Sequence, residues 1–128
     1  MTPGVPTEPG RELLAGIAER DYARIAACFA ESSTFHVLTP KPRLRDHSGP
    51  EEAAERYRFW LAPLEPYALL EGDVVEIADR IRVRYLFRGK DPEHGWQLNE
   101  HTSYADVEDG RIRWMTLPCT GFRPPPAP

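Results

Sequence analysis

The residues best suited to acid–base chemistry lie in the segment Trp96–Val107, which alternates like a β-strand. His101 shares its parity with Gln97, Asn99 and Ser103, so these polar side chains should form one row on one face. A histidine between apolar walls titrates near neutral pH and serves as a general acid or base. We take His101 as the leading catalytic candidate and Asn99 as a substrate-binding neighbour. A structural histidine bonded to a neighbouring strand is an equally weighted alternative.

The choice of His101 depends on the register of this strand. A β-bulge would shift the alternation by one residue, turning Glu100 and Thr102 inward and His101 outward. Glu100 would then be the interior acid or base. The sequence leaves both registers open, and Glu100 is therefore a catalytic candidate as well.

Asp73 is another catalytic candidate. If Ala78-Asp79-Arg80 is a turn, Asp73 lies opposite Tyr85 on the apolar face of the following strand. Desolvation there would raise the pKa of the carboxyl group, which suits a general base. The favoured alternative is a bulge at Gly72-Asp73 with a solvated carboxylate, because glycine in a strand often marks a bend. In the same register Arg82 lies opposite Glu76, which indicates a salt-bridged outer face.

Aromatic side chains complete the set. Tyr57 and Trp60 lie at helical spacing and, with Tyr85, are candidates to bind a flat apolar substrate. Aromatic residues in this pattern more often belong to the plain core. The histidines and cysteines lack the close spacing of metal ligands, so we predict no metal site.

The elements that must position these residues follow an α+β order. The apolar spacing predicts a first helix around Leu13–Ile17 and a second one that Asp21 caps and Ser32-Ser33 ends. A strand at 34–38 and a proline loop come next. Ser48 and Glu51 then have capping-box spacing for a third helix, which Pro63 closes. From residue 67 onward the period is two, which predicts a meander of three or four strands with a tight turn at 108–110.

Three stretches of this chain resemble the nuclear transport factor 2-like superfamily, particularly its SnoaL-like and ketosteroid-isomerase-like members. They are AERDYARIAACFAESSTFHV, HSGPEEAAERYRFWL and DVEDGRIRWMTL. The resemblance implies a cone-shaped α+β fold, in which three N-terminal helices pack against a strongly curved antiparallel sheet that encloses a pocket. Such folds host isomerases, polyketide-cyclase-like enzymes, epoxide hydrolases, dehydratases and non-catalytic binders, so they define no single activity.

The catalytic residues of ketosteroid isomerases do not carry over. The positions that match their general base and their oxyanion tyrosine hold Val37 and Leu13, and their second acid falls at Thr102 or Ser103. The Asp-Arg-Asp set of limonene-epoxide-hydrolase-like members is not evident either. The resemblance then implies an isomerase, cyclase or hydrolase that acts on an apolar cyclic metabolite by cofactor-free acid–base chemistry. The alternative is a non-catalytic ligand-binding or assembly domain.

Length and composition limit the remaining possibilities. A chain of 128 residues predicts one domain, 1–128, with short disordered proline-rich ends at about 1–6 and 123–128. The net charge of −4 argues against nucleic acid as a partner, and no apolar run reaches the ~20 residues that cross a bilayer. The absence of a glycine-rich phosphate loop argues against a nucleotide cofactor, and we predict no cofactor.

Two further expectations concern location and assembly. Cys28 and Cys119 are the only cysteines, and two free thiols fit a reducing, cytoplasmic location. Trp96, Leu98 and Tyr104 alternate with the row of His101 and should lie on the outer face of the sheet. Apolar side chains there predict a homodimer through the sheet.

Overall fold

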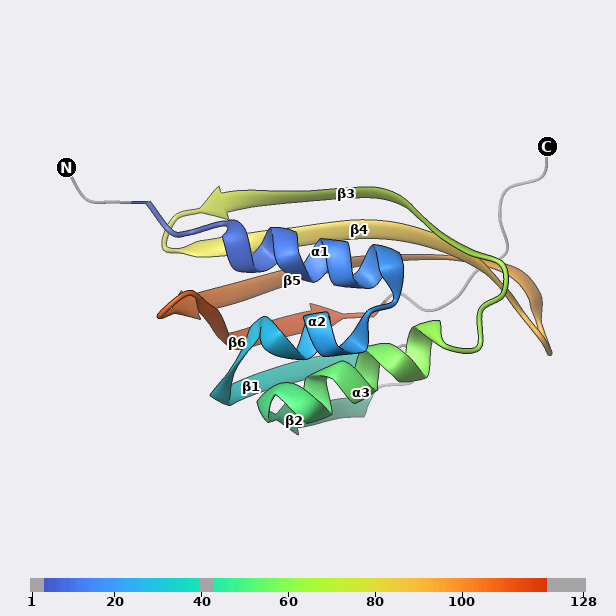
Figure 1. Ribbon diagram of the computed structural model, residues 1–128, viewed down its shortest axis with the longest axis horizontal. Coiled ribbons are helices and arrows are strands. Elements are labelled where there is room, and N and C mark those ends of the chain that lie inside the picture. The colour runs from blue at the N-terminus through green and yellow to red at the C-terminus, as the bar shows by residue number, and fades with distance from the viewer. Residues whose placement is uncertain (1–3, 40–42, 120–128) are drawn as a thin grey trace.

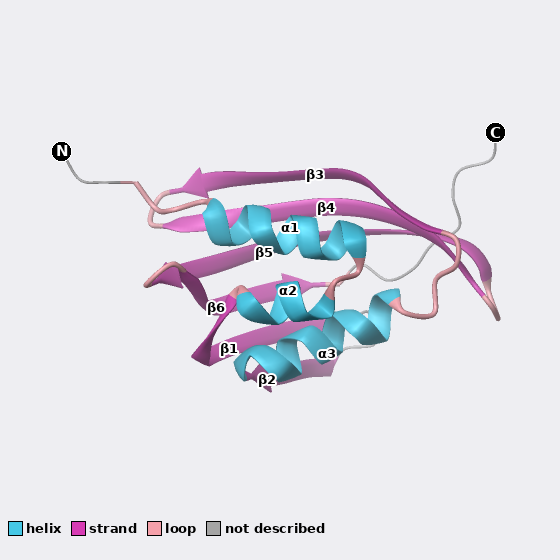
Figure 2. Cartoon of the chain, in the orientation of Figure 1, coloured by secondary structure: helices cyan, strands magenta, loops and turns pink. Residues whose placement is uncertain are grey.

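A six-stranded curled sheet carries three helices on one of its faces in the computed structural model, which describes residues 4–39 and 43–119 (Figure 1). The helices, coloured cyan in Figure 2, all lie on the same side of the sheet. They are α1 (Glu8–Glu19), α2 (Tyr22–Ala27) and α3 (Gly49–Leu61). The strands are β1 (Phe29–Thr39), β2 (Arg43–Ser48), β3 (Tyr67–Ile77), β4 (Arg80–Asp91), β5 (Gly95–Glu108) and β6 (Arg111–Pro118).

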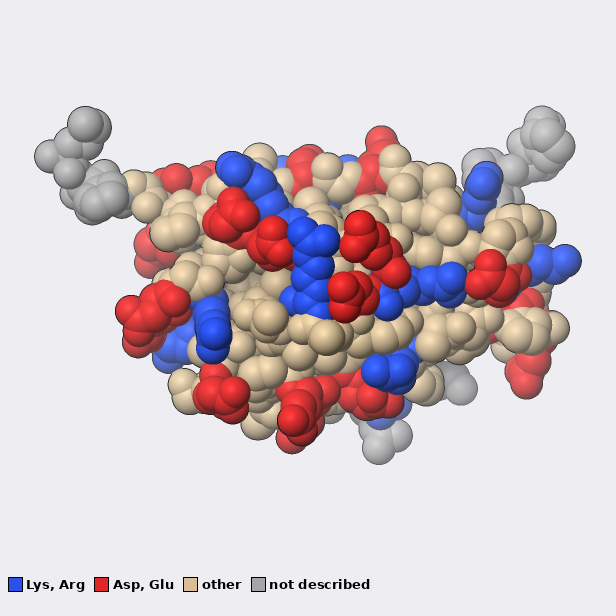
Figure 3. All heavy atoms as spheres, viewed as in Figure 1, with Lys and Arg blue, Asp and Glu red and all other residues tan. Residues whose placement is uncertain are grey.

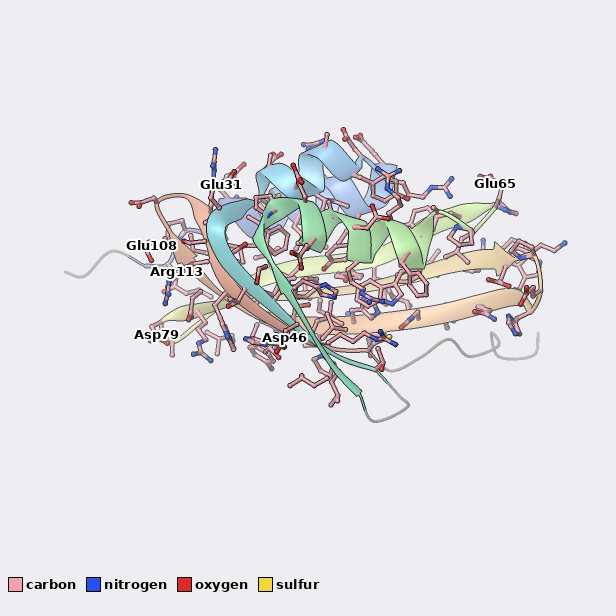
Figure 4. The ribbon with its side chains drawn as sticks, turned by 90° about the horizontal axis from the view of Figure 1, so that it is seen from below. Glu31, Asp46, Glu65, Asp79, Glu108 and Arg113 are labelled. Carbon is pink, nitrogen blue, oxygen red and sulfur yellow. The ribbon has the colours of Figure 1, made fainter. Side chains whose placement is uncertain are left out.

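The strands follow the spatial order β2-β1-β6-β5-β4-β3. Only β1 and β6 run parallel to each other, and the other neighbours in the described sheet are antiparallel. The predicted meander is confirmed with four strands, β3 to β6. Its last turn contains Asp109 and Gly110, both at positive φ, as a two-residue hairpin connection requires. Seen from below, the sheet curves around the helices, and Asp46 lies on its opposite side (Figure 4).

The first two helices begin largely as predicted, but the second ends early. The Asp21 side chain accepts a hydrogen bond from the Arg24 amide at 3.1 Å, which confirms it as the N-cap of α2. The predicted end at Ser32-Ser33 is wrong, because α2 stops at Ala27 and Phe29 begins β1. The Ile112 amide donates to the Cys28 carbonyl at 2.8 Å and draws the chain into the sheet there.

The segment before α3 is a strand where the sequence predicted a loop. β2 pairs with β1 and leads directly into α3, so two helices precede the sheet and the third follows its first two strands. The capping of α3 also differs in detail. The Ser48 side chain makes no capping bond, and the Ser48 amide donates to the Glu52 carboxylate at 3.1 Å, in place of the predicted Glu51 partner.

The core fills the space between the helices and the inner face of the sheet. Strict alternation along β4 buries every second side chain. The middle of β5 alternates in the same way, and most of the side chains that it buries are polar. The buried members of these strands are Ile81, Val83, Tyr85, Phe87, Asn99, His101, Ser103 and Ala105. The helices contribute their apolar faces, chiefly Leu13, Ile17, Ile25, Tyr57, Trp60 and Leu61.

The register between β3 and β4 differs from the prediction by one residue. The turn contains two residues, Ala78 and Asp79, with Ala78 at φ 54°, so Ile77 pairs with Arg80. A turn one residue shorter moves the side chains of β3 from Glu71 to Ile77 to the other face, as far as the register shift between Leu69 and Glu71. Asp73 consequently lies opposite Arg84 on the outer face, and its predicted placement opposite Tyr85 is wrong.

The outer face of the sheet carries ion pairs, though with different partners from those predicted. Arg82 lies opposite Val75, so the expected pairing with Glu76 is wrong. Arg84 instead pairs with Glu100. On the helix-covered face, basic and acidic side chains are interspersed (Figure 3).

Two predictions fall wholly or partly outside the described residues. Most of the predicted proline-rich ends lie in 1–3 and 120–128, and the predicted proline loop lies at 40–42. Among the described helices, none combines the length and the apolar content needed to cross a membrane.

Candidate functional site

A chain of three hydrogen-bonded side chains lies buried between α3 and the sheet. The Tyr85 hydroxyl is 2.7 Å from His101 Nδ1 and 3.1 Å from the Tyr57 hydroxyl. Tyr85 on β4 and His101 on β5 are directly opposite each other in the strand pairing, and Tyr57 reaches them from α3. All three side chains are almost completely inaccessible to solvent. The predicted candidates His101, Tyr85 and Tyr57 therefore lie together in one hydrogen-bonded cluster.

Aromatic rings enclose the imidazole of His101. The Trp60 ring lies edge-on with its centroid 4.7 Å away, and the Tyr85 and Phe87 rings follow at 5.1 and 5.6 Å. Tyr57 in turn contacts Trp60, with the ring centroids 5.4 Å apart. Phe87 was not predicted as a site residue, although it shares the parity of Tyr85 in the sequence. These rings fill the space around His101 and make its surroundings apolar.

Burial keeps the whole chain uncharged at neutral pH. It lowers the pKa of His101 to about 3 and raises the pKa values of Tyr57 and Tyr85 well above their usual range. The expectation that His101 titrates near neutral pH is therefore wrong. A neutral imidazole with such a low pKa is a poor proton acceptor, but it still carries one N–H donor.

The hydrogen-bond chain favours one placement of that proton. If Tyr57 donates to Tyr85 and Tyr85 donates to His101 Nδ1, the imidazole proton resides on Nε2. Nε2 is buried and has no hydrogen-bond partner among the described residues, so only this N–H stays unpaired. In the reverse direction, His101 Nδ1–H donates to Tyr85 and Tyr85 donates to Tyr57. That arrangement leaves both the Tyr57 hydroxyl proton and the Nε2 lone pair unpaired. Each unpaired buried group costs about 1–3 kcal/mol, so the first arrangement is preferred and presents Nε2–H as a donor.

The other polar residues of β5 continue the row along the strand. Asn99 is fully buried, and its side-chain amide donates to Cys119 Sγ at 3.8 Å. Ser103 is also fully buried, and its hydroxyl has no hydrogen-bond partner within residues 4–39 and 43–119. Cys28 and Cys119 are both buried free thiols. The predicted inward row of Asn99, His101 and Ser103 is therefore confirmed.

The two candidate carboxylates lie outside this interior. β4 and β5 pair without a register shift from Ile81 to Asp91, so the alternative register that turns Glu100 inward is wrong. The Glu100 carboxylate is 2.5 Å from the Arg84 guanidinium on the outer face. Asp73 is solvent-exposed on the same face. Neither candidate faces His101.

Trp60 contacts His101 and also lines a hollow at the surface. This hollow is open to solvent, has a volume of about 580 Å³ and adjoins the C-terminal half of α3 and the β4–β5 turn. Its lining consists of Arg58, Phe59, Trp60, Ala62, Pro63, Asp91, His94 and Gln97. Trp60 thus contacts His101 with its ring and contributes to the wall of the hollow. Within the described residues, no group of three or more His, Cys, Asp or Glu side chains is arranged to hold a metal ion.

With this geometry established, comparison with known proteins assigns the family. Residues 11–115 match the sequence model of the SnoaL-like domain, and the chain belongs to this family, within the nuclear transport factor 2-like superfamily. The resemblance read from the sequence is thereby confirmed. No curated protein sequence matches this chain.

Solved structures share the fold at low sequence identity. A putative polyketide cyclase from Streptomyces antibioticus is 16% identical with a TM-score of 0.72, over 90% of this chain and 91% of that one. A putative ketosteroid isomerase from Kribbella flavida is 15% identical with a TM-score of 0.68, over 94% of this chain and 82% of that one. An LEH-like epoxide hydrolase from M. tuberculosis is 10% identical with a TM-score of 0.66, over 88% of this chain and 80% of that one.

Proposed function

We propose that this chain binds a small, largely apolar molecule in the space that the Trp60 ring vacates when it turns outward, where His101 Nε2–H donates a hydrogen bond to a carbonyl oxygen of that molecule. The observation that carries the proposal is the buried, unpartnered Nε2 at the end of a neutral hydrogen-bond chain. A buried donor without a partner is costly, and binding an oxygen acceptor removes this cost. The surrounding aromatic rings suit a flat, cyclic ligand.

The arrangement acts on a ligand by polarising its carbonyl group. A fixed donor in an apolar, water-poor site stabilises negative charge that develops on the oxygen more strongly than water does. This polarisation acidifies the C–H bonds next to the carbonyl, a step common to isomerisations and cyclisations of ketones. Tyr85 and Tyr57 hold the imidazole and fix its tautomer. We therefore favour an isomerase, cyclase or hydrolase that requires no redox cofactor, with His101 as the electrophilic residue.

Access to His101 requires the Trp60 indole to move. The ring packs against the imidazole and also lines the open hollow of about 580 Å³. Rotation of Trp60 toward solvent would join the hollow to the interior, so that Phe59 and Trp60 line the path of the ligand. A hollow of this size matches the range that small-molecule sites occupy.

A non-catalytic ligand-binding domain is the second candidate function. The observation that favours it is the position of Asp73 and Glu100, which lie on the outer face and supply no carboxylate base to the interior. In that case the donor of His101 would select carbonyl ligands without turning them over.

One experiment compares both functions. The probe is 3-cyclohexen-1-one, whose isomerisation to the conjugated ketone appears in the ultraviolet and whose carbonyl stretch reports hydrogen bonding in the infrared. Wild type should lower the carbonyl stretching frequency of the bound ketone, and His101→Phe should abolish this shift. His36→Gln, which alters the histidine that pairs with Asp46 on the outer face of the sheet, is the matched control. Isomerisation by wild type would support the enzyme, and a shift without turnover would support the binder. An identical shift in His101→Phe would contradict both.

We further propose that two copies associate through the outer face of the sheet. Trp96 is 42% exposed and Tyr104 37% exposed on that face, and Leu98 lies between them on the same strand. The guanidinium of Arg88 lies 5.2 Å from the centroid of the Trp96 ring, adding a cation–π contact beside these apolar groups. Covering such a patch by its own counterpart on a second chain gives a symmetric dimer.

A further inference from the structure

A cluster of basic side chains lies between β2 and α3, apart from the hydrogen-bond chain of His101. Arg45 and His47 lie on the inner face of β2, opposite Val37 and Phe35 of β1. β2 leads straight into α3 (Figure 4), and α3 brings Arg56 alongside. The Arg56 Nε–H donates to His47 Nε2 at 3.1 Å.

The two arginines of this cluster have no salt-bridge partner within the described part of the chain. Neither Arg45 nor Arg56 forms a salt bridge with a described carboxylate, whereas Arg20, Arg24, Arg84 and Arg113 all do. Arg45 Nε is buried and lacks a hydrogen-bond partner among residues 4–39 and 43–119. Partly buried arginines are normally paired, because desolvating a lone charge is costly. This cluster therefore has the electrostatics of a site without its anion.

The protonation of His47 follows from its partner. A guanidinium group can only donate, so His47 Nε2 must accept and the ring must be neutral with its proton on Nδ1. Burial, followed by the charge of Arg56, lowers the pKa of His47; Glu52 acts in the opposite direction and Arg45 in the same one, and the net lowering agrees with this tautomer. The pKa of Arg56 is also lowered, first by burial and then by Arg45. The two arginines thus experience each other's charge.

Contacts with aromatic rings hold the Arg56 guanidinium in place. Its central carbon lies 5.1 Å from the centroid of the Phe59 ring and 5.7 Å from that of Trp60. Such contacts orient the planar group, so that less freedom is lost when it binds a carboxylate through two hydrogen bonds. The Nη groups of Arg56 form no hydrogen bond with the described residues.

A hollow of about 250 Å³ lies directly over this group, lined by His47, Glu52, Glu55, Arg56 and Phe59. The two carboxylates in the lining are already engaged. The Glu52 carboxylate accepts from the Ser48 amide, and the Glu55 carboxylate pairs with Arg58 at 3.3 Å. The Phe59 ring, 69% exposed, offers an apolar surface beside the guanidinium. The volume suits a small molecule rather than a drug-sized one.

We propose that this hollow is an anion site that binds the carboxylate of a small, apolar organic acid. Arg56 is the principal ligand, Arg45 supplies a second positive charge behind it, and Phe59 packs against the apolar part. The site stands on residues separate from His101 and does not depend on the carbonyl-binding role proposed above.

Benzoate and its neutral isostere benzamide test the proposal by calorimetric titration at constant ionic strength. We expect wild type to bind benzoate about tenfold or more tightly than benzamide. Arg56→Gln and Arg45→Gln should each weaken benzoate binding about tenfold and leave benzamide binding unchanged. Arg11→Gln, which removes an exposed arginine of α1 outside the hollow, is the control and should bind benzoate like wild type. His101→Phe should also bind benzoate normally, which separates this site from the carbonyl site.

Circular dichroism and thermal melting verify that each variant is folded. Arg56→Lys retains the charge without the paired donors, so it should bind benzoate more weakly than wild type and more tightly than Arg56→Gln. No benzoate binding by wild type at millimolar concentration would overturn the proposal. Equal affinities for benzoate and benzamide, or equal affinities of wild type, Arg45→Gln and Arg56→Gln for benzoate, would overturn it as well.

Discussion

Replacing Tyr85 by phenylalanine should expose the energetics of the buried hydrogen-bond chain. The Tyr85 hydroxyl is the middle member, bonded to both His101 Nδ1 and the Tyr57 hydroxyl. Its removal leaves two fully buried polar groups without these bonds, each at about 1–3 kcal/mol. We expect a loss of roughly 3 kcal/mol in the free energy of unfolding. That is a large fraction of the ~5–15 kcal/mol that stabilises a typical domain.

Replacing Tyr57 by phenylalanine should cost less, because Tyr85 still donates to His101. We expect a loss of about 1 kcal/mol. The double variant gives the sharper test. In Tyr85→Phe the Tyr57 hydroxyl is buried and unpaired, so removing it in the double variant relieves a cost. The double variant should therefore be at least as stable as Tyr85→Phe alone.

Urea unfolding followed by circular dichroism measures these free energies. Tyr104→Phe serves as the control, because Tyr104 lies on the outer face, and it should change the stability by less than about 0.5 kcal/mol. Losses of the two single variants that simply add in the double variant would refute the coupling of these hydroxyl groups. A loss from Tyr85→Phe no larger than that from Tyr104→Phe would refute it too.

Three other predictions concern pH, assembly and thiols. His101 is neutral in the folded protein down to pH about 3, whereas in the unfolded chain it binds a proton below about pH 6.5. Acidification from pH 7 to pH 5 therefore favours the unfolded chain, and the free energy of unfolding should fall by about 2 kcal/mol more in wild type than in His101→Phe. An equal loss in both proteins, measured by urea unfolding, would contradict the buried neutral state. Light scattering should give twice the 14.6 kDa chain mass at micromolar concentration, and Tyr104→Arg should give the single-chain mass; a wild-type monomer would exclude the dimer. A thiol reagent should titrate both Cys28 and Cys119 in protein that is denatured without reductant. An intact mass two daltons low would instead reveal a disulfide, which would remove the support for a cytoplasmic location.

The inner row of the site was predictable because β5 is long and regular against β4. Its residues from Gly95 to Ala105 pair with β4 without a register shift, and this regular alternation fixes which face each side chain takes once one face is buried. Polar residues at Asn99, His101 and Ser103 on the buried face are a departure from a plain core, and the sequence shows it directly. The helical spacing of Tyr57 and Trp60 likewise placed both against the sheet.

The position of Asp73 was not predictable from periodicity. It depends on whether the turn after Ile77 has two or three residues, and Ala78 adopts a positive φ that sequence statistics assign chiefly to glycine and asparagine. β3 also contains a register shift between Leu69 and Glu71 and lies at the edge of the sheet, so burial constrains its alternation weakly.

β2 escaped detection because its inward positions are charged or polar. Arg45 and His47 replace the apolar residues that mark a half-buried strand, and backbone pairing with β1 holds the segment. The basic cluster was hidden for the same reason. The low pKa of His101 was equally beyond the sequence, because it results from the depth of burial and not from a charged neighbour.

The central claim is that His101 presents Nε2–H as an unpaired donor in the apolar interior. Long-range ¹H–¹⁵N correlation spectra of ¹⁵N-labelled protein at pH 7 test it most directly, with His101→Phe used to assign the signals. The account predicts a neutral ring whose Nε2 carries the proton and whose Nδ1 accepts from Tyr85. A proton on Nδ1 with a bare Nε2, or a doubly protonated ring, would contradict it.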